Sequence, residues 1–180
     1  MVSLARALSK MGVCSRREAC RWIAAGRVSV GGEVAREPGL RVDPARALVA
    51  VDGQRVTEGR RRVTVAFHKP AGCVTTRVDP GGRATIYDLL GDLGRWLAPV
   101  GRLDKGSAGL LILTNDTRLG QRLTAPEHEV PKAYHARVAG LPDEAALRVL
   151  REGVPLEDGP TRPAEVRLLG GDRQGGAWLE

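Results

Sequence analysis

The chain has 180 residues, 42% of them hydrophobic, and its 28 Lys and Arg against 21 Asp and Glu give a formal net charge of +7. This hydrophobic content allows a packed core, and no apolar run is long enough to cross a bilayer, which argues against a membrane protein. The N-terminus lacks the apolar segment of a signal peptide, and the three cysteines show no metal-ligand spacing. We therefore expect reduced thiols and a cytoplasmic location.

The excess positive charge lies in the first third of the chain. Residues 1–62 hold 13 Lys and Arg and 6 Asp and Glu, whereas residues 63–180 hold 15 of each kind. This segregation predicts a module that binds a polyanion, joined to a neutral domain. A basic surface that is merely solvated is the alternative.

Two helices are predicted at the start of the basic module. Residues 3–10 carry leucines at helical spacing and are followed by Gly12. Ser15 and Glu18 have the spacing of a capping box, which opens a second helix that ends at Gly26. The apolar face of this second helix is predicted to hold Ala19, Cys20 and Ile23. Its basic face, which can contact several phosphates, carries Arg16, Arg17 and Arg21, with Arg27 just beyond.

Two short hairpins and a linker complete the module. Residues 28–34 turn at two glycines, and residues 48–56 turn at Asp52 and Gly53. Residues 58–62 indicate a linker, whose arginines either add phosphate contacts or form a solvated hinge.

The module resembles the RNA-binding domain named after the fourth protein of the small ribosomal subunit. The motif G-V-x-S-R-R-E-A at 12–19 and the motif G-R-V-x-V at 26–30 carry this resemblance, which implies a small αββ-type domain over residues 1–58. Binding is expected to depend on phosphates and RNA shape, because Trp22 is the only aromatic residue in the module. The expected RNA contacts are Ser15, Arg16, Arg17, Arg21 and Arg27.

A second domain is predicted over residues 63–180. Alternation, apolar runs and capping residues define its elements. The predicted strands are 63–68, 110–113, 131–138, 164–169 and 177–180, and the predicted helices are 85–90, 117–124 and one from Pro142 to Gly153.

The stretch G-R-L-D-K-G-S-A-G-L-L-I-L-T-N-D at 101–116 is the most informative part of this domain. Four consecutive apolar residues at 110–113 predict a strand buried on both faces, and Asp104 lies just before it. Neighbouring cations should favour the ionised carboxylate, whereas partial burial should oppose it. A carboxylate in this position can act as a nucleophile. Alternatively, it pairs with Arg102 or caps a turn through Ser107.

This stretch resembles the catalytic motif of the RsuA/RluB-type pseudouridine synthases. K-P-A-G at 69–72 and K-A-Y at 132–134 match further motifs of that family, the first mostly architectural. The resemblance implies an α+β fold with a mixed, largely antiparallel sheet and flanking helices. It also implies that Asp104 is the nucleophile, Arg102 orients it, Tyr134 holds the detached base, and Arg83 and Lys132 contact RNA. No cofactor or metal is implied.

The expected partner is ribosomal RNA, with the large subunit favoured, and the expected state is a monomer. Family members continue beyond the last predicted strand with a basic segment that nothing here matches, so we expect a truncated chain or a shortened relative. A non-catalytic RNA-binding or ribosome-assembly factor is therefore the alternative function. A nucleoside hydrolase would need a second carboxylate, and no second acidic motif is comparably clear.

Overall fold

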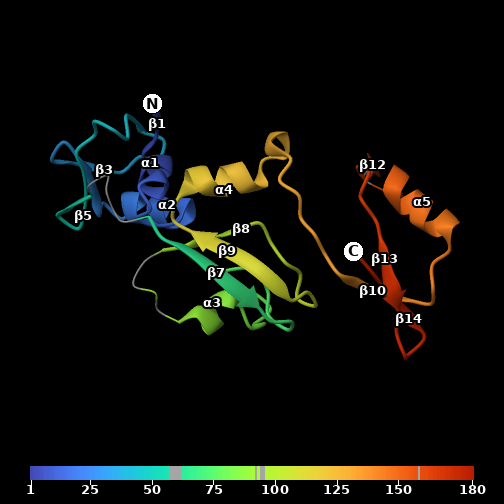
Figure 1. Ribbon diagram of the computed structural model, residues 1–180. Helices are drawn as coiled ribbons and strands as arrows, with labels where there is room; N and C mark the ends of the chain where they lie inside the picture. Colours follow the sequence, from blue (N-terminus) through green and yellow to red (C-terminus); the bar gives the residue numbers. More distant parts are fainter. Residues whose placement is uncertain (57–61, 92, 94–95, 158) are drawn as a thin grey trace. The chain divides into compact units, whose positions relative to one another are not determined.

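The computed structural model describes residues 1–56, 62–91, 93, 96–157 and 159–180 (Figure 1). The chain divides into two compact units, Met1–Val130 and Pro131–Glu180. The predicted linker lies outside the described residues except for Arg62, and the predicted boundary between residues 58 and 63 stays a prediction.

The first unit begins with two short capped helices. Strand β1 (Val2–Ser3) leads into α1 (Leu4–Lys10), and α2 (Arg16–Ala24) follows. The side chains of Ser3 and Ser15 accept hydrogen bonds from the backbone N–H three residues on, so both act as N-caps. The predicted apolar face of α2 is wrong in one position: Ala19 and Ile23 are buried, but Cys20 is exposed. Residues four apart share a face of a helix, and Cys20 is turned away from that face.

A four-stranded antiparallel sheet packs with these helices. Its order is β3-β2-β5-β6, and β1 pairs separately with β4. The tight turn of the second predicted hairpin is confirmed, because Asp52 and Gly53 have φ angles of +50° and +75°. The strands are β2 (Val28–Val30), β3 (Glu33–Ala35), β4 (Arg41–Val42), β5 (Val49–Val51) and β6 (Gln54–Val56). The core of this part includes the fully buried Leu4, Leu8, Ile23, Val28 and Val49.

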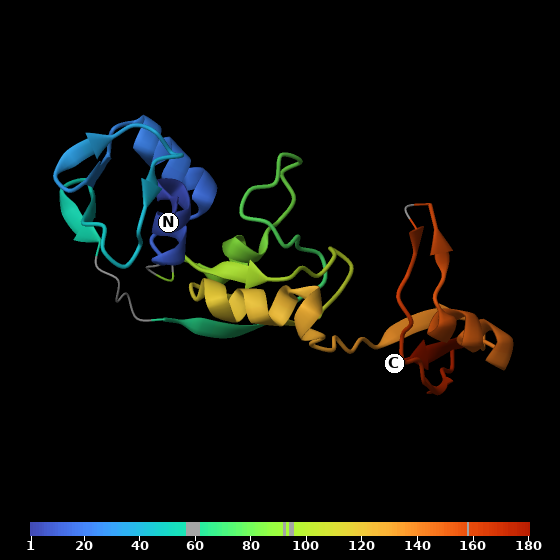
Figure 2. The same ribbon diagram turned by 90° about the horizontal axis from the view of Figure 1, so that it is seen from above.

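The rest of the first unit is built on a three-stranded antiparallel sheet with the order β7-β9-β8. Its strands are β7 (Thr64–Lys69), β8 (Ala98–Val100) and β9 (Gly109–Thr114). The helices are α3 (Ile86–Leu90), α4 (Thr117–Thr124) and the 3-10 helix η1 (Pro126–His128). Helix α4 lies against β8 and β9 (Figures 1 and 2). The predicted α+β class is confirmed, and the predicted strand over 110–113 lies within β9, the central strand of this sheet.

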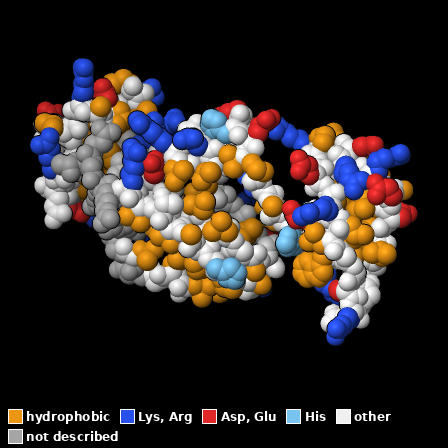
Figure 3. Space-filling view, viewed as in Figure 1, with side chains coloured by type: hydrophobic (Ala, Val, Ile, Leu, Met, Phe, Trp, Pro, Cys, Tyr) orange, Lys and Arg blue, Asp and Glu red, His pale blue; other side chains and the backbone are white. Residues whose placement is uncertain are grey.

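The prediction that residues 110–113 are buried on both faces is wrong. Leu111 and Leu113 lie in a hydrophobic cluster with Ile86 and are 3% and 0% exposed. Leu110 is 67% exposed, because side chains of a strand alternate between faces and this one points away from the cluster. Hydrophobic side chains are visible over β7 and β9 in Figure 3.

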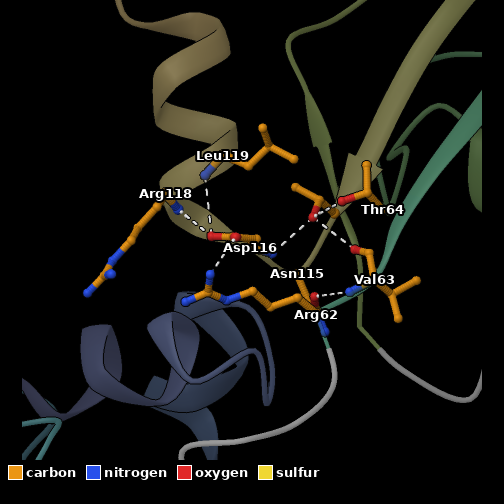
Figure 4. A network of polar contacts seen from close by, with 8 residues as sticks. Arg62, Val63, Thr64, Asn115, Asp116, Arg118 and Leu119 are labelled. Carbon is orange, nitrogen blue, oxygen red and sulfur yellow. Dashed lines mark hydrogen bonds and ion pairs between the residues drawn. The ribbon is translucent and has the colours of Figure 1, made fainter.

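A polar network closes the end of this sheet where β9 leads into α4 (Figure 4). The Thr114 hydroxyl donates to the Val63 carbonyl at 2.8 Å, and the Val63 N–H donates to Asn115 Oδ1 at 2.8 Å. Asp116 accepts from the N–H groups of Arg118 and Leu119 and so caps α4. The T-N-D at the end of the informative stretch is therefore used to join a strand to a helix.

The second unit contains a three-stranded antiparallel sheet with the order β10-β14-β13. The prediction of a strand over 131–138 is wrong in its first half, because residues 131–135 are not in a strand and β10 begins at Ala136. A strand needs a partner, and β14 pairs with residues 136–139. The elements are β10 (Ala136–Ala139), α5 (Glu144–Glu152), β11 (Pro155–Leu156), β12 (Gly159–Pro160), β13 (Leu168–Gly171) and β14 (Gly176–Leu179).

Candidate active site and RNA-binding surface

Asp104 lies in the turn that connects β8 to β9, and its side chain is exposed. Among the described residues, none forms a hydrogen bond or ion pair with its carboxylate, and the exposed Arg102 likewise has no ion pair. The predicted partial burial is wrong, because Asp104 and the two residues that follow it in the turn are all exposed. The turn itself is closed by the Ser107 N–H, which donates to the backbone carbonyl of Asp104 at 3.1 Å. The carboxylate is thus free to meet a ligand.

Lys69 anchors the backbone of this turn through hydrogen bonds to its carbonyl groups. Although it is a lysine, it is fully buried. Its ammonium donates to the carbonyls of Pro70, Asp104 and Ser107 at 3.1, 2.9 and 2.8 Å. All three ammonium hydrogens are therefore used, which compensates the cost of burying the charge. The sequence marked this lysine as architectural, and its direct hold on Asp104 was not foreseen.

Two further residues after β7 hold the same turn by its backbone. The Gly72 N–H donates to the Lys105 carbonyl at 2.7 Å. The Thr75 hydroxyl donates to the Leu103 carbonyl at 2.6 Å and accepts from the Leu103 N–H at 3.2 Å. Together with Lys69, these contacts anchor the backbone on both sides of Asp104 while leaving its side chain exposed. A reactive group held in this way is pre-organised for reaction.

Residues 76–84 form a loop that follows Thr75 and is held together by internal hydrogen bonds. The Arg83 guanidinium donates to both carboxylate oxygens of Asp79, at 2.6 and 3.0 Å, and its backbone N–H donates at 2.9 Å. The side-chain hydrogen bond from Arg83 lowers the pKa of Asp79 to about 2. The guanidinium of Arg77 lies over the Tyr87 ring, 5.5 Å from its centre. The proposed RNA contact at Arg83 stays a prediction, and in this structure that guanidinium locks the loop.

Lys132 and Tyr134 lie in the second unit. Both are exposed, Tyr134 by 56%, and both precede β10 in a segment outside any strand. The prediction that Lys132 and Tyr134 belong to a strand is therefore wrong. Their part in the site stays a prediction, because Asp104 and Arg102 belong to the first unit whereas Lys132 and Tyr134 belong to the second.

The basic residues of the N-terminal module fall into two groups. Arg16, Arg17 and Arg21 are exposed on α2 and make no ion pair within the described residues. Arg27 differs, because its Nε donates to Asp52 at 2.9 Å and its guanidinium lies over the Trp22 ring at 5.1 Å. The hydrogen bond to Asp52 raises the pKa of Arg27. The Ser15 hydroxyl is used as the N-cap of α2, so its RNA contact, like the others, stays a prediction.

Neither a membrane span nor a metal site is found in the part of the chain that the structure describes. No helix there is long and apolar enough to span a membrane. No group of three or more His, Cys, Asp or Glu side chains is placed to hold a metal ion in that part of the chain.

Comparison with known proteins gives two family matches and several relatives. The model of the RNA pseudouridylate synthase family matches residues 63–166, and the model of the S4 domain matches residues 2–46. An uncharacterized RNA pseudouridine synthase of Aquifex aeolicus is 42% identical over 93% of this chain and 68% of its own length. The ribosomal large subunit pseudouridine synthases B of Haemophilus influenzae and Bacillus subtilis are 43% and 36% identical.

These relatives are longer than the chain. The alignments cover 93% and 97% of this chain, but 48% of the Haemophilus protein and 70% of the Bacillus protein. A solved structure described as a pseudouridylate synthase matches with a TM-score of 0.57 at 24% identity, over 99% of this chain and 76% of that one. At this identity the structural match supports the fold alone.

Proposed function

We propose that this chain, which belongs to the RNA pseudouridylate synthase family, isomerises a uridine of ribosomal RNA to pseudouridine with Asp104 as the nucleophile. The observation that supports this most is the exposed carboxylate of Asp104, which pairs with none of the described residues and lies on a turn whose backbone is anchored by Lys69 and Thr75. A structural aspartate would be expected to use its carboxylate in a cap or an ion pair, as Asp116 and Asp79 do.

The proposed reaction breaks the N-glycosidic bond of the uridine, turns the detached base and joins it to the sugar through carbon. No atoms are gained or lost, so the reaction needs no cofactor. The anionic carboxylate of Asp104 attacks the nucleoside. Arg102, two residues earlier, supplies a nearby positive charge, and Tyr134 offers an exposed ring on which the base can stack. A uridine in folded RNA must leave its stack to reach the carboxylate.

The proposed substrate is RNA of the large ribosomal subunit. The names of the Haemophilus and Bacillus relatives support this choice. The exposed arginines Arg16, Arg17 and Arg21 would hold the RNA by its phosphates, independently of the chemistry at Asp104. We further propose that the protein acts as a monomer in the cytoplasm.

The decisive experiment compares the parent with Asp104→Asn on large-subunit ribosomal RNA. The amide keeps the shape of the side chain but cannot attack as an anion, so pseudouridine formation should disappear while RNA binding is retained. Glu127→Gln is the matched control, because Glu127 is another exposed carboxylate without an ion pair in the described part of the chain. Conversion at the parental rate by Asp104→Asn would refute the assignment. If the parent binds the RNA but never converts uridine, a non-catalytic RNA-binding factor is the better description.

A further inference from the structure

We infer that Thr75 is a positioning residue for Asp104, acting through the backbone of Leu103. This inference rests on the proposed function, since it concerns the placement of the proposed nucleophile. Thr75 and Leu103 are 28 residues apart in sequence and are joined by two hydrogen bonds through a single hydroxyl.

The Thr75 hydroxyl satisfies backbone groups of Leu103 that a neighbouring strand would otherwise pair with. Strand β8 ends at Val100, so Leu103 lies beyond the last backbone pair of the sheet. The Thr75 hydroxyl satisfies both the N–H and the carbonyl of Leu103, at 3.2 and 2.6 Å. A hydroxyl can do so because it donates one hydrogen and accepts through its lone pairs. The backbone direction into Asp104 is therefore set by one side-chain oxygen.

Thr75 is itself held in place by the two residues before it. Cys73 is 3% exposed and belongs to the hydrophobic cluster of this sheet. The Val74 N–H donates to the Ala84 carbonyl at 2.9 Å, and the Val74 carbonyl accepts from the Ile86 N–H at 3.1 Å. Thr75 is thus anchored to the core on one side and contacts the candidate catalytic turn on the other.

The same residue opens the self-closed loop of residues 76–84. The bidentate pair between Asp79 and Arg83 keeps this loop in one shape. Val74 is hydrogen-bonded to Ala84 at the end of the loop and to Ile86 just beyond it, and Thr75 is bonded to Leu103. A displacement of the end of the loop is therefore expected to move the backbone before Asp104. Thr75 therefore links the loop to the candidate nucleophile, whereas Lys69 holds the backbone carbonyl of Asp104 itself.

The test compares Thr75→Val with Thr75→Ser in the full protein. Valine keeps the branched shape but lacks the hydroxyl, and serine keeps the hydroxyl. We expect kcat to fall roughly tenfold to hundredfold in Thr75→Val, since small displacements of catalytic groups have effects of this order, with RNA affinity unchanged. Thr75→Ser should restore kcat. Thr124→Val is the matched control, because it removes a hydroxyl that donates within α4, to the Gly120 carbonyl at 2.9 Å.

Amide hydrogen exchange at Leu103 provides a readout that does not require activity. Its N–H loses the hydroxyl acceptor in Thr75→Val, so exchange should become faster there and remain at the parental rate in Thr75→Ser and Thr124→Val. Unchanged exchange at Leu103 in Thr75→Val overturns the inference, whether or not the protein is active. Faster exchange with an unchanged kcat overturns it as well.

A parent that forms no pseudouridine refutes the proposed function instead, and the exchange data then still decide whether Thr75 holds Leu103. If Thr75→Val does not fold, Thr75→Ala removes the hydroxyl with less steric change.

Discussion

The ammonium of Lys69 donates a hydrogen bond to the backbone carbonyl of Asp104, 2.9 Å away, from a fully buried position. The two residues are 35 positions apart in sequence, and this contact is one of those that anchor the turn between β8 and β9. Lys69 contacts Asp104 through this carbonyl and not through the side chain, and no described residue forms a salt bridge with the Asp104 carboxylate. The proposed nucleophile is therefore positioned by its backbone and remains available to RNA.

Removing the Lys69 ammonium should destabilise the first unit. Lys69→Met keeps most of the side-chain volume but leaves the carbonyls of Pro70, Asp104 and Ser107 without their donor. Buried carbonyl groups that lose a charged hydrogen-bond donor lower the stability of the folded state. We therefore expect the free energy of unfolding to fall by about 2–4 kcal/mol. Urea denaturation followed by a probe in the first unit measures this. The exposed Lys105→Met serves as the control and should change stability little, and equal stability of the two variants would contradict the role of Lys69.

The pair between Asp79 and Arg83 should give the loop of residues 76–84 a pH dependence. The folded-state pKa of Asp79 is lowered to about 2 from the ordinary 3.8. A lowered pKa means that the stabilising contribution is complete above the ordinary value and is lost as pH falls from there through about 2. A carboxyl NMR titration of Asp79 should therefore have its midpoint near the lower value. Arg83→Gln should move the midpoint back toward 3.8, and a parental midpoint already at 3.8 would show that the pair does not form in solution.

Exposed arginines on α2 should contribute to RNA affinity mainly through charge. We expect Arg17→Ala to weaken binding to ribosomal RNA fragments and to reduce the slope of log K against log salt by about 1, as for one phosphate contact. Arg27→Ala is the informative comparison, because Arg27 already binds Asp52 and lies over Trp22. It should change the salt slope less. Binding that does not respond to salt would contradict an electrostatic interface.

Asp116, at the start of α4, takes part in both a helix cap and a surface ion pair (Figure 4). Two substitutions can distinguish the contributions of these two contacts to stability. Asp116 caps α4 and also lies 3.3 Å from the guanidinium of Arg62, which is 68% exposed. Asp116→Ala removes both contacts and should cost about 1–2 kcal/mol of stability, the usual range for a lost N-cap. Asp116→Asn keeps a capping oxygen and loses the charge, so its effect should be small, because exposed ion pairs contribute little. Thermal unfolding of the two variants provides the comparison, and a similar loss in both would mean that the ion pair dominates.

Local structure followed closely from the sequence. Ser3, Ser15 and Thr85 each cap the helix that was predicted to follow, and the Asp52-Gly53 turn joins the strands on either side. These features depend on contacts within three or four residues, so the residues concerned suffice to specify them. The sequence also singled out Asp104 and the alternation of β7, again because the signal is contained in one short stretch.

Burial and strand pairing were decided only by the tertiary structure. Leu110 belongs to an apolar run yet is exposed, and β10 begins at Ala136 because β14 pairs with residues 136–139. Lys69, a charged residue, is fully buried because the carbonyls of Asp104 and Ser107 come to it from a distant part of the chain. In each case the outcome depends on which remote segment occupies the space beside the residue. That neighbour is supplied by folding, and the local sequence contains no signal for it.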